Sequence, residues 1–152
     1  MPRKQNVKNQ KTEKKGIKIL KDLIPNLYVP DASQKRRLYD ILKISSKKYS
    51  RSFDAVILNV KSFEQIKSKE DFTLIEIKTT GDEKVTDLPY GVFFGITQNE
   101  EHLFKSLDNY QLCIVHTGLN EYVRLDFKDY ESLIQNKRTQ YQVNFRRKPK
   151  EY

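Results

Sequence analysis

Two carboxylates and one lysine in this sequence are spaced so that they could act together on a phosphate. Glu76 and Lys78 lie near the end of an apolar run, and Asp54 opens another apolar run upstream. Side chains two residues apart in a strand share one face, so Glu76 and Lys78 would project side by side, roughly 7 Å apart. Two carboxylates can bind Mg²⁺, which keeps several waters and also takes a phosphate oxygen as a ligand. A lysine beside the metal can orient or deprotonate an attacking water, its pKa being lowered by the cation.

Two strands must bring these side chains together. The run 71–80 is apolar on both faces at its start, which predicts a central strand, and the run 52–60 predicts a strand opened by Asp54. If the two pair as an antiparallel hairpin across the polar connection 61–70, the start of the first lies beside the end of the second. We therefore expect Asp54 to meet Glu76 and its neighbouring lysine. One face of the second strand would carry Phe72, Leu74, Glu76 and Lys78, and the other Ile75 and Ile77.

Length and charge limit the class of protein. A chain of 152 residues suits one domain, and 32% charged with 37% hydrophobic residues suits a small domain with a large solvated surface. The net charge of +9 favours a polyanionic partner, either nucleic acid or an anionic membrane surface, although a merely basic protein without such a partner is an alternative. No apolar run reaches the ~18 residues of a membrane span, and no signal peptide is recognisable, so we expect no membrane association and a cytoplasmic location.

Other site chemistries find little support. The single cysteine, Cys113, lies in an apolar run and is expected to be buried, so a cysteine metal cluster within one chain is excluded. His102 and His116 have no cysteine or histidine partner at metal-binding spacing and are expected to be surface or packing residues. The phosphate-binding glycine loop, the serine nucleophile elbow and the dinucleotide fingerprint are all absent from the sequence.

The ends of the chain are basic. Residues 1–11 predict a flexible basic arm, 12–145 a single domain, and 146–152 a basic C-terminal tail. Thr12 is suited to cap a helix with an apolar stripe, and Pro25 would end that helix. The segment 34–44 fits a helix at its start and a strand at its end.

Basic residues upstream of Asp54 are candidates for contact with nucleic acid. Lysines and serines just before Asp54 could bind phosphates, and arginines could add contacts to bases, although a solvated turn is an equal alternative for this stretch. The candidates are Lys35, Arg36, Arg37, Lys47, Lys48 and Arg51.

The second half of the chain predicts further helices and strands. Thr97 and Glu100 match a capping box that begins a helix running to about residue 107. Further elements are expected as strands at 110–116 and 121–127, a helix at 128–136 and a last strand at 141–145.

The order of these elements, together with Asp54 and the triplet Glu76-Ile77-Lys78, resembles the restriction-endonuclease-like or PD-(D/E)xK nuclease superfamily over about residues 12–116. The signature of that family is an Asp at the start of one core strand and (Asp or Glu)-x-Lys on the next. Phe53 stands where the family often has proline. Other acid-x-Lys triplets occur in the chain, but only Glu76-Ile77-Lys78 follows a strand that an Asp opens.

The resemblance implies an α/β fold with a restriction-endonuclease-like core, in which a mixed central β-sheet is flanked by helices. It implies a Mg²⁺-dependent endodeoxyribonuclease with catalytic Asp54, Glu76 and Lys78, and with Asp54, Glu76 and the backbone carbonyl of Ile77 as metal ligands. Cleavage of double-stranded DNA would leave a 5′-phosphate. The small size fits a site-specific restriction enzyme, for which symmetric cutting favours a homodimer.

Several alternatives remain open. Homing, junction-resolving and repair nucleases use the same core and are not distinguished by the sequence. A non-catalytic nucleic-acid-binding protein on a nuclease-like core would explain the net charge equally well.

Overall fold

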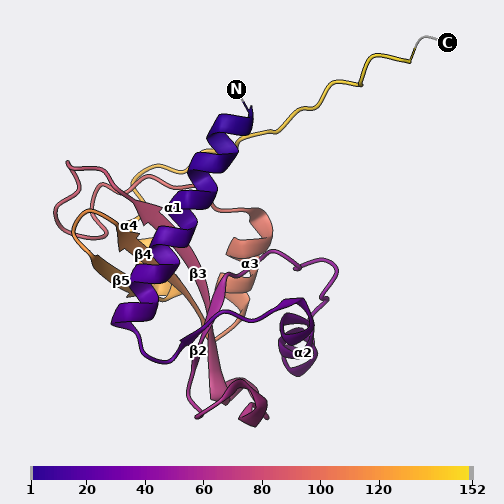
Figure 1. Ribbon diagram of the computed structural model, residues 1–152, viewed down its shortest axis with the longest axis vertical. Coiled ribbons are helices and arrows are strands. Elements are labelled where there is room, and N and C mark those ends of the chain that lie inside the picture. The colour runs from indigo at the N-terminus through magenta and orange to yellow at the C-terminus, as the bar shows by residue number, and fades with distance from the viewer. Residues whose placement is uncertain (1, 151–152) are drawn as a thin grey trace.

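A five-stranded mixed sheet forms the centre of the protein (Figure 1). The structure is a computed structural model that describes the backbone of residues 2–150 and the side chains of residues 12–150. The strand order is β1-β2-β3-β4-β5; β3 and β4 are parallel and the other neighbours are antiparallel. The strands are β1 Leu27–Tyr28, β2 Ala55–Leu58, β3 Phe72–Thr80, β4 Tyr110–His116 and β5 Glu121–Leu125. The predicted α/β class, with a mixed sheet flanked by helices, is confirmed at this level.

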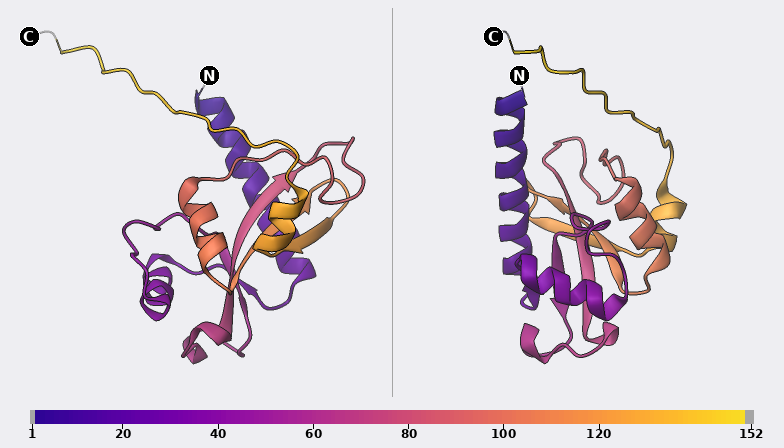
Figure 2. Two further views of the ribbon diagram at one scale, coloured as in Figure 1. Left: turned by 180° about the vertical axis from the view of Figure 1, so that it is seen from behind. Right: turned by 90° about the vertical axis from the view of Figure 1, so that its right-hand side faces the viewer.

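Helices cover both faces of the sheet. They are α1 Pro2–Leu23, α2 Ala32–Leu42, α3 Gln98–Ser106 and α4 Phe127–Leu133, with the short 3₁₀ helices η1 Phe63–Gln65 and η2 Lys69–Asp71 between β2 and β3. Figure 2 shows α1 alone along one face, while α3 and α4 lie on the other. Among the described residues, no helix is long and apolar enough to span a lipid bilayer.

The central strand β3 contributes to both cores. Phe72 and Leu74 belong to the larger core, which the buried residues of α2, α3 and α4 complete. Ile75 and Ile77 belong to a smaller core beneath α1. The two-residue alternation predicted for this strand is therefore confirmed, and it leaves the polar end of β3 on the face of the larger core.

Helix α1 begins earlier than its expected cap. It starts at Pro2 instead of Thr12, because proline suits the first helical position and the residues that follow include Lys, Arg and Gln, which favour helices. It ends at Leu23, two residues before Pro25, as expected. The side chains of residues 1–11 lie outside the described residues, and the flexibility of that segment stays a prediction.

Helix α1 approaches the sheet closely at Gly16. A Cβ atom at this position would lie 2.4 Å from Cγ2 of Thr79 on β3. Alanine normally favours a helix by about 1 kcal/mol over glycine. Because β-branched Thr79 is stiff, we expect Gly16→Ala instead to lower the free energy of unfolding by about 1–3 kcal/mol in urea titrations. Adding Thr79→Ser, which removes Cγ2, should recover most of that loss. Equal or higher stability of Gly16→Ala alone would contradict this packing.

Helix α2 corrects the expectation for the segment 34–44. The helix runs to Leu42, and Lys43, with φ of 59°, ends it in the left-handed conformation, so no strand forms there. The helical period prevails because Leu38 is fully buried and Ile41 packs against the same core. An Asp31 cap, which the sequence pattern did not lead us to predict, begins the helix.

The C-terminal elements are shorter than expected. The capping box of Thr97 and Glu100 is confirmed at the start of α3. The strand predicted at 141–145 is wrong, since residues 134–150 form neither helix nor strand. Val143 and Phe145 are exposed there, because alternation alone does not stabilise a strand that has no neighbour to bond.

Candidate active site

The hairpin of β2 and β3 places Asp54 beside the end of β3. Ala55 is paired with Ile75, so Asp54, one residue before β2, lies opposite the segment after Ile75. The Asp54 N–H donates to the Ile75 carbonyl at 2.9 Å, and the Asp54 Oδ2 accepts the N–H of Ile77 at 2.8 Å. The expected meeting of Asp54 with the polar end of β3 is confirmed.

Lys78 lies between two carboxylates. Its Nζ is 3.3 Å from Oε1 of Glu76 and 3.3 Å from Oε1 of Glu100. All three side chains are largely inaccessible, with 16% of Lys78, 5% of Glu76 and 7% of Glu100 exposed. The lysine is therefore held in one orientation from two sides, at the edge of a site that contains three acidic residues in all.

Glu100 is a site residue that sequence reasoning identified only as a helix cap. Its Oε1 also accepts the Thr97 N–H at 2.9 Å, while its own N–H donates to Oγ1 of Thr97 at 3.1 Å. One carboxylate thus caps α3 and contacts Lys78. Spacing in the sequence pointed only to the cap; the second contact follows from the crossover of α3 between the parallel strands β3 and β4, which returns its first turn to the end of β3.

Glu76 is the most constrained acid of the group. Its Oε2 is buried and has no hydrogen-bond partner among the described residues. Burial, followed by the charges of Asp54 and Glu100, raises the pKa of Glu76 from its ordinary value of 4.5 to about 10. An acceptor left bare in this way is costly unless something binds it.

The neighbouring groups respond to the same burial. Burial raises the pKa of Asp54, and the hydrogen bond from Ile77 opposes it only in part. Burial also acts to lower the pKa of Lys78, but Glu76 and Glu100 outweigh it, so the pKa of Lys78 is raised. The lysine is consequently cationic in the metal-free protein. A bound cation would act in the opposite direction on it.

The donor set is compatible with Mg²⁺ but not with a metal cage made of protein alone. Within the part of the chain that the structure describes, no group of three or more His, Cys, Asp or Glu side chains is gathered to hold a metal. Mg²⁺ commonly takes only one or two carboxylates and keeps several waters. Asp54 and Glu76 meet that requirement, and Oε2 of Glu76 would be available to Mg²⁺ once the metal displaces the proton that the raised pKa leaves on Glu76. The part assigned to the Ile77 carbonyl stays a prediction.

The basic residues predicted to contact nucleic acid separate into groups. Arg37 turns toward the β2–β3 connection, where its Nη2 donates to the carbonyl of Ile66 at 2.6 Å. Lys48 lies over the ring of Tyr49, with its Nζ 5.2 Å from the ring centroid. Arg51 is exposed. Arg37 therefore supports the fold at a distance from Asp54, and the sequence cluster does not act as one surface.

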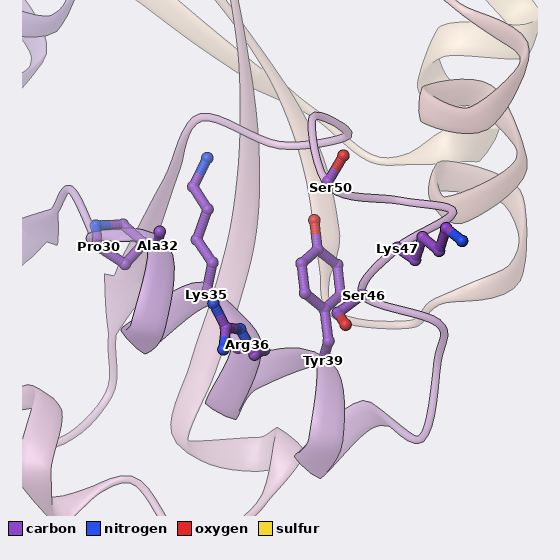
Figure 3. Close-up of a pocket in the computed structure, with 8 residues that line it drawn as sticks. All are labelled: Pro30, Ala32, Lys35, Arg36, Tyr39, Ser46, Lys47 and Ser50. Atoms are coloured by element: carbon purple, nitrogen blue, oxygen red, sulfur yellow. The ribbon is translucent and has the colours of Figure 1, made fainter.

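The remaining three basic residues line one pocket. Lys35 and Arg36 come from α2, and Lys47 comes from the loop that leads to β2 (Figure 3). Nζ of Lys35 donates to the carbonyl of Phe53 at 3.1 Å, directly before Asp54. This hydrogen bond links a residue of the pocket to the residue that directly precedes Asp54.

The two histidines and the cysteine are packed against or bonded to neighbouring residues and lie outside the candidate site. Cys113 is buried, as predicted. The His102 ring stacks on Tyr49 with a centroid separation of 5.9 Å. His116 is buried; its Nε2 lies 2.9 Å from the Asp82 carbonyl, and its Nδ1 accepts backbone N–H groups of the following turn. These contacts match the packing role expected from the sequence.

No protein-family model, curated protein sequence or solved structure matches this chain. The geometry of the site is therefore the basis for its chemistry.

Proposed function

We propose that the protein is a Mg²⁺-dependent endodeoxyribonuclease that hydrolyses phosphodiester bonds in duplex DNA. The observation that carries the proposal is the convergence of Asp54, Glu76 and Lys78 at the end of β3, with one carboxylate oxygen buried and bare. Two acids and a lysine that share one small site match the needs of metal-assisted phosphodiester hydrolysis. The net charge of +9 supports a polyanionic substrate.

Each residue has a distinct part in the proposed reaction. Asp54 and Glu76 would hold the metal, and the chemistry that Mg²⁺ supplies when bound is polarisation of the phosphate and activation of water. Lys78 would donate hydrogen bonds to the attacking water or to a phosphate oxygen, where negative charge develops. Glu100 contacts Lys78 and caps α3, and it is not one of the proposed metal ligands, so we treat it as a positioning residue.

A restriction-type enzyme that cuts both strands symmetrically would act as a homodimer with one site per subunit. Homing, junction-resolving or repair activity on the same core is the alternative within this class. A non-catalytic DNA-binding protein is the alternative outside it. A pure binder gains nothing from buried acids near its DNA surface, because carboxylates repel phosphate.

Purified protein should cut DNA in Mg²⁺ or Mn²⁺ and should be inactive in excess EDTA, since the proposed carboxylates act through a metal. Plasmid, phage and branched DNA would be incubated side by side, with the products resolved on gels and their ends mapped. Ca²⁺ should support binding without cleavage. Site-specific ends with a 5′-phosphate would favour restriction, whereas cleavage of branched DNA alone would favour junction resolution. Cleavage that survives EDTA would exclude the mechanism, and metal-independent binding without any cleavage would favour the non-catalytic alternative.

Glu100→Gln should lower kcat about 10- to 100-fold, the range typical of residues that orient catalytic groups. Glutamine can replace glutamate in a capping box, so the thermal stability of α3 should change little while the charge that orients Lys78 is removed. Glu101→Gln is the matched control on the same turn, because Glu101 pairs with Lys137 and Tyr130 instead. Full activity of Glu100→Gln would remove Glu100 from the mechanism.

A further inference from the structure

An open pocket of about 490 Å³ lies between α2 and the loop that leads to β2 (Figure 3). Lys35, Arg36 and Tyr39 line it from α2. Ser46, Lys47 and Ser50 line it from the loop. Its lining, as far as the structure describes the chain, includes no acidic side chain, so positive charge and hydroxyl groups define its character.

Two cations at this pocket have no partner among the described residues. No hydrogen bond or ion pair from those residues engages the guanidinium of Arg36 or the ammonium of Lys47. Arg37, the next residue along α2, is by contrast bonded to Ile66. In Figure 3 the Lys47 ammonium points outward at the rim, on the opposite side of the pocket from Arg36. These two side chains are therefore available to an anion that enters from solvent.

The pocket is joined to the proposed active site through the backbone. The Tyr39 hydroxyl donates to the Tyr49 carbonyl, and Nζ of Lys35 donates to the Phe53 carbonyl at 3.1 Å. Phe53 directly precedes Asp54, so Lys35 at the pocket contacts the backbone one residue before the proposed metal ligand. The loop that lines the pocket at Ser46, Lys47 and Ser50 also leads within a few residues to Asp54.

We propose that this pocket binds a phosphate group of the DNA strand that is being cut, next to the phosphodiester at the active site. The inference rests on the proposed function, because it takes the ligand to be the nuclease substrate. Arginine and lysine with serine hydroxyls are the donors that typically contact nucleic-acid phosphates. The group bound is either an internal phosphodiester or a 5′-terminal phosphate, and small probes distinguish the two.

The test is titration of ¹⁵N-labelled full-length protein, in EDTA, with three probes. They are dithymidine with a phosphodiester linkage, the same compound with an added 5′-phosphate, and dithymidine with a neutral methylphosphonate linkage. Amide shifts should appear in residues 46–50 with a charged probe and be absent with the methylphosphonate. Binding of both charged probes would indicate an internal phosphodiester. Binding of the 5′-phosphorylated probe alone would indicate a strand end.

The double variant Arg36→Gln, Lys47→Gln should weaken the binding of the charged probe about tenfold or more, because it removes two charge-assisted hydrogen bonds. With duplex DNA, the same variant should flatten the dependence of log K on log salt by about 0.9 for each DNA phosphate that the protein no longer neutralises. Lys67→Gln, Lys69→Gln is the charge-matched control, because both lysines are exposed on the β2–β3 connection. Thermal unfolding of both variants confirms that each is folded.

Equal affinity of the two double variants, or amide shifts that map away from the pocket, would overturn the inference. Probe binding is measured without metal or cleavage, so an inactive protein that still binds through Arg36 and Lys47 would refute the nuclease and retain the phosphate pocket. If the protein cleaves DNA but the double variant Arg36→Gln, Lys47→Gln binds the charged probe as tightly as the wild type does, the phosphate pocket alone would be refuted.

Discussion

Replacing Asp54, Glu76 or Lys78 singly with alanine is expected to abolish DNA cleavage, reducing its rate by at least about 10³-fold, while DNA binding largely persists. The acids lie beside the buried end of β3, where they would hold the metal and contribute little to the attraction of DNA. Lys78 is already oriented by two carboxylates, so its removal also leaves those acids without their counterion.

The measurement is single-turnover cleavage of plasmid DNA beside a binding titration in Ca²⁺. Lys78→Ala removes both the charge that pairs with the buried acids and the packed methylene groups, so it is the variant at greatest risk of unfolding. Lys78→Met, which restores the aliphatic packing but not the charge, accompanies it to separate the two losses. Glu101→Gln serves again as the control for a nearby acid outside the site. Full activity of Glu76→Ala would refute the assignment, since Glu76 supplies the buried, unpartnered Oε2 that is proposed as a metal ligand beside Asp54.

Glu76→Gln is expected to stabilise the metal-free protein at pH 8 by about 2–4 kcal/mol, even as it removes activity. Burial and the charge of Asp54 raise the pKa of Glu76 from 4.5 to about 10. Between these values the folded state binds a proton that the unfolded state releases, so the contribution of Glu76 to stability falls as the pH rises. It is fully present below pH 4.5 and disappears progressively up to about pH 10. Glutamine cannot ionise and also supplies donors to the acids around it.

Urea unfolding of both proteins from pH 5 to pH 9 in EDTA provides the measurement. The difference in the free energy of unfolding between Glu76→Gln and the wild type should grow with pH. Mg²⁺ should reverse the order, because a ligand that binds only the folded state stabilises it, and the variant lacks one of the proposed ligands. A difference that is constant with pH would show that Glu76 does not carry a raised pKa, whatever the activity of the protein.

The positions of Asp54, Glu76 and Lys78 could be predicted because they depend only on two strands that are neighbours in the sequence. Asp54 directly precedes β2 and Glu76 lies on β3, and hairpin pairing of these two strands brings the start of one to the end of the other. The alternation along β3 then assigns each side chain to a face, with Ile75 and Ile77 beneath α1. Neither step requires knowledge of how distant elements pack.

The distribution of the basic residues could not be read in the same way. Lys35, Arg36 and Arg37 are consecutive, and the sequence presents them as one cluster. On a helix, successive side chains turn by about 100°, so neighbours in sequence face different surroundings. Arg37 consequently reaches Ile66, whereas Arg36 lines the pocket.

Whether β1 and the segment 141–145 form strands likewise depends on a neighbouring strand to which each can hydrogen-bond. β1 is only two residues long and carries too little pattern to be recognised, yet it forms because β2 offers an edge to Leu27 and Tyr28. The segment 141–145 has the alternating pattern of a strand but finds no edge among the described residues, and it remains extended and exposed. Pattern measures propensity, whereas a strand needs hydrogen bonds to another strand.

Glu100 makes one contact that could be predicted from local sequence spacing and one that only the tertiary structure determines. Its capping box with Thr97 is a contact over three residues and could be predicted from spacing. Its contact with Lys78 joins residues far apart in the chain, and it exists only because α3 crosses over between the parallel strands β3 and β4. Local periodicity therefore specified β2, β3, their hairpin and the Asp54, Glu76 and Lys78 group. The packing of α3 on the sheet added the second carboxylate that holds the lysine, because such a contact depends on the path of the intervening chain and leaves no repeating trace in the residues themselves.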